Sequence, residues 1–153
     1  MSTTKPIKKV SNSNLLSPEE YKKRGDSKYK NGEYKVAIEN YTKAINLLPY
    51  NERSLLLSKI LNCRATCYYI LKYYNDCIND TTKIIDTLKD TTNTRARVLR
   101  AKAYEQTKQF IKSSKDAKYV LHDIPPSKVG QSNRAECETI LKRCQRNSIA
   151  NLS

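Results

Sequence analysis

The chain has 153 residues and a formal net charge of +14, and 38% of its residues are hydrophobic. No run approaches the ~18 apolar residues of a membrane span, and the N-terminus lacks the apolar segment of a secretory signal. A chain of this length can bury a core as a single domain. We therefore expect one cytoplasmic, monomeric domain with no membrane partner.

The scarcity of helix-breaking residues indicates the fold class. The chain contains three glycines and five prolines, and both residue types are disfavoured inside helices. We therefore predict an all-α protein whose helices are separated by short turns.

The five cysteines show no metal or disulfide pattern. They stand at positions 63, 67, 77, 137 and 144, without paired C-x-x-C spacing. The first three could in principle gather around a metal, but a fourth ligand is missing because the only histidine, His122, lies far along the chain. We expect buried, reduced thiols, with no cofactor and no metal.

The first predicted helix follows a basic, flexible tail at residues 1–16. Ser17 is placed to cap it, and Glu20, three residues later, completes a capping box. The helix is expected to run from Pro18 to Lys30 and to end at "NGEY", where Gly32 can adopt the left-handed backbone conformation.

A second helix is predicted from Tyr34 to Leu47. Its apolar residues recur at three- and four-residue spacings, and Pro49 ends it. Ala37 and Ala44 lie on one face, where small side chains let two helices approach closely. The two segments together form a helix hairpin.

The same pattern returns twice along the chain. An aromatic residue is followed three positions later by a small one at Tyr34 and Ala37, Tyr74 and Cys77, and Phe110 and Ser113. Nine residues before each aromatic stands another small residue, at Gly25, Ala65 and Ala101. The intervals of 40 and 36 residues between the aromatics are near the ~34-residue period of tetratricopeptide repeats.

At these positions the chain resembles the tetratricopeptide repeat (TPR) family. The first repeat matches most closely, through Tyr21, Gly25, Tyr29, Gly32, Tyr34, Ala37, Tyr41, Ala44 and Pro49. "NCRATCYYILKYYNDCINDTTKII" and "RVLRAKAYEQTKQFIKSSKDAKYVL" continue it, although Lys108 and Ser113 replace the usual glycine and small apolar residue. The resemblance covers about residues 18–122. It implies a right-handed superhelix of three antiparallel hairpins, similar to co-chaperone TPR domains and to tetratricopeptide repeat protein 1.

The expected TPR domain covers residues 17–147, with repeats at about 18–51, 58–91 and 94–127. The first helix of the second repeat is expected to be extended, from about Glu52 to Leu71. After a loop, Ser132 is expected to cap a final helix at about 133–146, which would cover the end of the stack. Residues 148–153 would form a second tail.

The leading helices of such hairpins line a concave groove. Helical register places eight residues in it, with Tyr29 as a further candidate. The eight are Lys22, Asp26, Lys59, Cys63, Thr66, Arg95, Leu99 and Lys102. Four are basic and one is acidic, so the predicted groove is near +3 and favours an acidic peptide.

The resemblance also implies a more specific site. Many co-chaperone TPR domains bind the acidic C-terminal tails of heat-shock chaperones through two lysines, two asparagines and an arginine. Lys22 and Arg95 match the two lysines, whereas Asp26 and Cys63 replace the asparagines and Leu99 replaces the arginine. An ordinary clamp, a modified groove for acidic peptides and a groove for an unrelated partner all remain open.

The function expected from the sequence is a non-enzymatic, co-chaperone-like adaptor. Its partner would be a protein with an acidic segment, for which a chaperone tail is one candidate. The alternative is a basic scaffold that binds nucleic acid or the ribosome, because residues 91–153 carry 13 Lys and Arg against 5 Asp and Glu. A solvated, lysine-covered surface would explain the same charge. No grouping of residues suggests catalysis.

Overall fold

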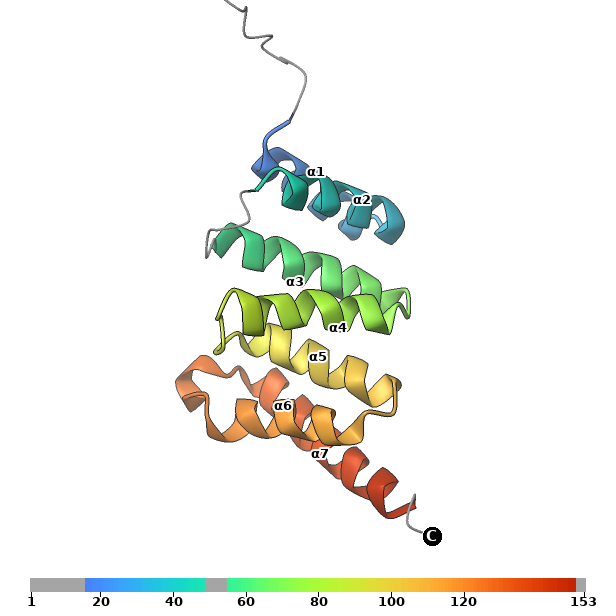
Figure 1. The fold of residues 1–153 in the computed structure, drawn as a ribbon, viewed down its shortest axis with the longest axis vertical. Coiled ribbons are helices and arrows are strands. Elements are labelled where there is room, and N and C mark those ends of the chain that lie inside the picture. Colours follow the sequence, from blue (N-terminus) through green and yellow to red (C-terminus); the bar gives the residue numbers. More distant parts are fainter. Residues whose placement is uncertain (1–15, 49–54, 151–153) are drawn as a thin grey trace, which may run out of the picture.

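The computed structural model describes residues 16–48 and 55–150, which form helices and turns without a strand. Figure 1 shows the helices stacked one after another in chain order. Three antiparallel hairpins are followed by one further helix, as predicted. None of the described helices has both the length and the apolar character needed to cross a bilayer.

The first hairpin consists of α1 (Pro18–Lys30) and α2 (Tyr34–Asn46). The predicted capping box is present, because the Glu20 amide donates to Ser17 Oγ over 3.2 Å and the Ser17 amide donates to Glu20 Oε2 over 2.7 Å. Gly32 has a φ of +77° in the connecting turn. The sequence thus predicted both helices to within one residue.

The two helices of this hairpin cross closely at Gly25. A Cβ atom added there would lie 2.5 Å from Cε1 of Tyr41. Tyr41 is only 1% exposed, and Ala37 and Ala44 beside it are completely buried. Gly25 therefore marks a close helix crossing in the first hairpin, as the repeat pattern indicated.

The second hairpin consists of α3 (Leu55–Ile70) and α4 (Tyr74–Thr82), and α4 continues into one π-helical turn, η1 (Lys83–Thr87). The start predicted for α3, at Glu52, falls outside the described residues, as does Pro49. The π-helical turn was not predicted. Lys72 holds the left-handed position of the hairpin turn, with φ of 64°.

The third hairpin consists of α5 (Thr94–Gln106) and α6 (Phe110–His122). Lys108 has a φ of 58° in its turn, at the position that corresponds to Gly32. Ser113 is completely buried and donates its hydroxyl to the carbonyl of Ala101 over 2.8 Å. The two departures from the family pattern are therefore accommodated without a change of fold.

The last helix, α7 (Gln131–Ala150), follows a short 3₁₀ segment, η2 (Pro126–Lys128). It packs against α5 and α6 and buries Cys137, Ile140 and Cys144. The prediction that Ser132 caps this helix is wrong, since Ser132 lies inside the first turn. Gly130 takes the cap position instead, and its carbonyl accepts from the Arg134 amide over 3.1 Å.

The helix α7 also ends later than expected, because residues 147–150 contain no glycine or proline to stop it. Ser148 donates to the carbonyl of Cys144 inside the helix. Part of the predicted C-terminal tail is therefore helical. Residues 1–15 of the predicted N-terminal tail and residues 151–153 lie outside the described range.

Buried ion pairs recur in the second and third hairpins. Arg64 donates from Nε and Nη2 to the two carboxylate oxygens of Asp80, each over 2.7 Å. Thirty-six residues later, Arg100 donates in the same way to Asp116 over 2.7 and 2.8 Å. The Nη1 atom of each arginine reaches back to the preceding hairpin, to the hydroxyls of Thr42 and Thr82 respectively. These networks were not predicted from the sequence.

Candidate functional site

A pocket of about 330 Å³ is formed by residues of α1, α2, α3 and α5. It brings together four of the eight predicted groove residues, Lys22, Asp26, Cys63 and Arg95. The remaining lining residues are Tyr29, Lys30 and Tyr41. We call this hollow the groove pocket.

Asp26 is the most constrained polar residue of the groove pocket. Lys22 Nζ donates to its Oδ2 over 2.6 Å, and the Tyr41 hydroxyl donates to its Oδ1 over 2.9 Å. Burial and the hydrogen bond to Asp26 raise the pKa of Tyr41 well above its ordinary value, so its hydroxyl remains a donor. Lys22, the residue that matches the first clamp lysine, therefore already has a carboxylate partner.

Cys63 faces the same hollow from α3. Burial raises the pKa of its thiol, and the positive charge of Lys22 offsets part of that rise. The thiol is therefore neutral near pH 7, and a neutral thiol is only a weak hydrogen-bond donor. Cys63 fills space where an asparagine amide would offer strong donors.

Arg95 is a cation of the groove pocket that forms no ion pair with a described carboxylate. It is exposed, and its Nη2 donates only to the Thr66 hydroxyl, over 3.3 Å. The Thr66 hydroxyl itself donates to the carbonyl of Asn62 over 2.7 Å. Thr66 thus lies beside the pocket and orients Arg95, although it does not line the pocket.

The remaining predicted residues do not line the groove pocket. Lys59 is exposed on α3, outside the lining. Leu99 is partly buried and packs against the cluster of Ala65, Cys77 and Ala103. The Nζ of Lys102 lies 5.1 Å from the centre of the Tyr69 ring.

Two lining residues, Lys30 and Tyr41, were missed from the sequence. Lys30 follows Lys22 and Asp26 at a four-residue spacing, so helical register could have predicted that Lys30 lies on the same face. Tyr41 belongs to α2 and reaches the pocket because α2 crosses α1 closely at Gly25. Helical register within a single helix cannot predict such a contact between two helices.

The charges of the groove pocket favour an anion. Three cations, Lys22, Lys30 and Arg95, face one carboxylate, that of Asp26. Because Asp26 neutralises Lys22, the cations left for a ligand are Arg95 and Lys30. No group of three or more His, Cys, Asp or Glu side chains among the described residues is arranged to hold a metal ion.

Comparison with known proteins shows similarity to domains of this architecture. The chain is 33% identical over 95 residues to DnaJ homolog subfamily C member 7 of Mus musculus. It superposes on the Hsp90 co-chaperone Cns1 from Saccharomyces cerevisiae with a TM-score of 0.74 and 25% identity over 88% of the chain. It superposes on the first TPR of Spaghetti (RPAP3), bound to the HSP90 peptide SRMEEVD, with a TM-score of 0.70 and 23% identity over 86% of the chain.

These matches show the fold: a superhelix of three antiparallel helix hairpins, the architecture of TPR domains, with a further C-terminal helix. No protein-family model matches the chain. The aligned segment covers 62% of the chain but only 18% of the mouse protein. The superposition covers 41% of the Cns1 chain and 93% of the Spaghetti domain. The resemblance to tetratricopeptide repeat protein 1 stays a prediction.

Proposed function

We propose that this chain is a non-enzymatic adaptor that docks an acidic C-terminal peptide, of the kind found on heat-shock chaperones, in the groove pocket. One observation carries the proposal: Lys22, Cys63 and Arg95, which occupy three of the clamp positions, line one hollow. A similar domain holds the peptide SRMEEVD. Lys30 supplies a further cation at the rim.

The expected affinity is lower than that of a complete clamp. A micromolar complex corresponds to about −8 kcal/mol. The missing charge-assisted hydrogen bond at Leu99 costs roughly 1.5–3 kcal/mol, and Asp26 competes with the ligand for Lys22. We therefore expect dissociation constants between micromolar and millimolar.

The test is fluorescence anisotropy of labelled SRMEEVD peptide titrated with the full chain. Arg95→Glu should weaken binding at least tenfold, because it places a carboxylate where the ligand carboxylate would bind. Arg146→Glu, which changes the same charge on an exposed part of α7, should change it less than twofold. The same peptide with a C-terminal amide should bind more weakly than the free acid.

Two results would refute the proposal. One is no detectable binding at millimolar peptide. The other is an equal loss in both variants, which would show that only the overall charge of the chain attracts the peptide.

A further inference from the structure

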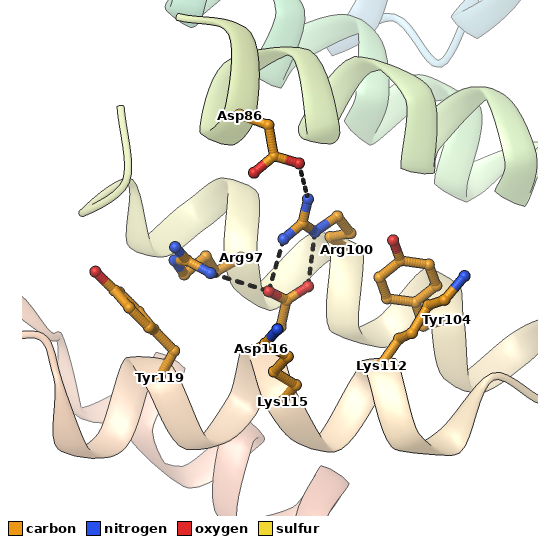
Figure 2. Close-up of a pocket in the computed structure, with 8 residues that line it drawn as sticks. All are labelled: Asp86, Arg97, Arg100, Tyr104, Lys112, Lys115, Asp116 and Tyr119. Atoms are coloured by element: carbon orange, nitrogen blue, oxygen red, sulfur yellow. Dashed lines mark hydrogen bonds and ion pairs between the residues drawn. The ribbon is translucent and has the colours of Figure 1, made fainter. Parts of the chain in front are cut away.

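A second pocket, of about 430 Å³, lies between α4 with its π-helical turn and α6, over α5 (Figure 2). Its lining residues are Asp86, Arg97, Arg100, Tyr104, Lys112, Lys115, Asp116 and Tyr119. None of these residues lines the groove pocket. We call it the inter-repeat pocket.

Part of the inter-repeat pocket has a structural role. Arg100 and Asp116 form the same bidentate pair as Arg64 and Asp80 in the second hairpin. Tyr104 likewise corresponds to Tyr68. Since this network recurs, it explains how the hairpins pack and does not by itself indicate a ligand.

Three further cations belong to the third hairpin alone. They are Arg97 on α5 and Lys112 and Lys115 on α6. At the equivalent positions, 36 residues earlier, the second hairpin has Leu61, Asp76 and Asn79. The second hairpin packs without these cations, so the repeat architecture does not require them.

These cations line the pocket and retain unused hydrogen-bond donors. Arg97 is 8% exposed, and its Nε and Nη1 donate to the Thr91 carbonyl and to Asp116. Its Nη2 has no hydrogen-bond partner among the described residues, and its guanidinium lies 3.6 Å from the centre of the Tyr119 ring. Lys115 is exposed and forms no ion pair with a described residue. Lys112 donates only to Gln109 Oε1, over 2.8 Å.

The charge of the pocket matches a doubly charged anion. Four cations, two from arginine and two from lysine, face two carboxylates, so two positive charges remain uncompensated. Asp86 is bound by Arg100 over 3.3 Å on the α4 side, and its carboxylate would repel an anion there. The other carboxylate, Asp116 on α6, is neutralised by hydrogen bonds from both Arg97 and Arg100. An anion is therefore favoured on the α6 side, next to Lys115 and the remaining donors of Arg97. A phosphomonoester carries about −1.5 to −2 charges at pH 7 and offers three acceptor oxygens.

We propose that the inter-repeat pocket binds the phosphate group of a phosphorylated serine or threonine side chain of a partner protein. Arg97 and Lys115 hold the phosphate oxygens, and Lys112 adds positive charge at the rim. The chain then has two docking points, one for an acidic peptide and one for a phosphorylated segment.

The test is an NMR titration of the ¹⁵N-labelled full chain with N-acetyl-phosphoserine methylamide. The amides of α6 and the Nε–H signals of Arg97 and Arg100 should shift and saturate. Lys112→Glu with Lys115→Glu should weaken binding at least tenfold. Lys35→Glu with Lys142→Glu, which alters the same charge elsewhere on the surface, should leave it within twofold.

A second variant tests the contribution of the buried guanidinium. Arg97→Leu introduces the residue that the second hairpin has at this position, and circular dichroism checks that the variant is folded. It should also weaken binding at least tenfold. Binding should decline as the pH falls below about 6, where the phosphate gains its second proton.

Three results would overturn the proposal. One is the absence of α6 shifts, and another is equal binding by the Lys112 and Lys115 double variant. The third is equal binding of N-acetyl-glutamate methylamide or of inorganic phosphate, which would indicate a general anion site rather than one for a phosphorylated side chain. The SRMEEVD titration is independent, because the double variant leaves the groove pocket intact.

Discussion

In the proposed peptide complex, Asp26 would compete with the ligand carboxylate for Lys22, to which it is already bound. Asp26→Asn should therefore tighten the binding of SRMEEVD at least tenfold. The change removes a negative charge that can cost up to ~4 kcal/mol against a carboxylate at ~4 Å in a dielectric of 20, and it frees Lys22. The asparagine still accepts from the Tyr41 hydroxyl.

The same anisotropy titration measures this change. Asp123→Asn, an exposed carboxylate outside the groove pocket, serves as the matched control and should alter binding less than twofold. Unchanged or weaker binding by Asp26→Asn would show that Asp26 does not compete with the ligand.

A substitution at Gly25 tests whether the close crossing of α1 and α2 stabilises the fold. Gly25→Ala should lower the free energy of unfolding by roughly 1–3 kcal/mol, because the new Cβ overlaps the buried Tyr41 ring. Urea denaturation measures the loss. Ser27→Ala, at an exposed position of the same helix, should stay within about 0.5 kcal/mol of the parent. A stable Gly25→Ala protein would mean that the ring moves aside freely.

At the scale of single helices and turns, the turns of the three hairpins each contain one residue in the left-handed conformation, and its identity differs between them. Gly32, Lys72 and Lys108 all have positive φ, between 58° and 77°. Lys108→Gly should raise the free energy of unfolding by about 0.5–1 kcal/mol, since the left-handed conformation is strained for a residue with a Cβ. Gly32→Ala should lower it by a similar amount or more. Urea denaturation of both variants measures the two changes in the free energy of unfolding. A Lys108→Gly variant less stable than the parent would contradict the prediction.

Helices were the most predictable part of this chain. The capping box at Ser17, the turn at Gly32 and the recurring small residues set the bounds of α1 and α2 to within one residue. The start of α7 was mispredicted because serine is a common cap, whereas here the Gly130 carbonyl accepts the first helical hydrogen bond. The π-helical turn after α4 has no local sequence signature.

The candidate site was less predictable, because it depends on contacts between helices. Helical register selected eight residues, of which four line the groove pocket. The other four, Lys59, Thr66, Leu99 and Lys102, do not line it. The pairing of Lys22 with Asp26 follows from a four-residue spacing and could have been predicted. The presence of Tyr41 in the pocket could not be predicted in this way, because it depends on how α2 crosses α1.

At the scale of the whole molecule, α7 covers the end of the stack. Ile140 is completely buried against the third hairpin. Ile140→Ala should lower the free energy of unfolding by about 2–5 kcal/mol. Hairpins in such stacks contact only their neighbours, so amide exchange should accelerate more in α5 and α6 than in α1 and α2. Uniform acceleration would show that the chain unfolds as one cooperative unit.

The high positive charge of the whole chain is partly neutralised within the fold. Arg97, Arg100 and Arg143, all in the basic C-terminal part, form ion pairs with Asp116 and Glu105. They leave fewer free cations for a nucleic acid than the composition suggested, although association with nucleic acid stays a prediction. If it occurs, retention of single-stranded RNA should fall steeply between 50 and 200 mM salt, by roughly 300-fold for six neutralised phosphates.

The bonds from Arg64 to Thr42 and from Arg100 to Thr82 each join one hairpin to the hairpin before it. Both arginines are also tied to an aspartate of their own hairpin, so each fixes two successive units at a set mutual rotation. We expect these two contacts to help set the angles between successive hairpins. Weakening either contact should therefore change the distance between Lys22 and Arg95, and with it the affinity for the proposed peptide, without altering any residue that lines the groove pocket.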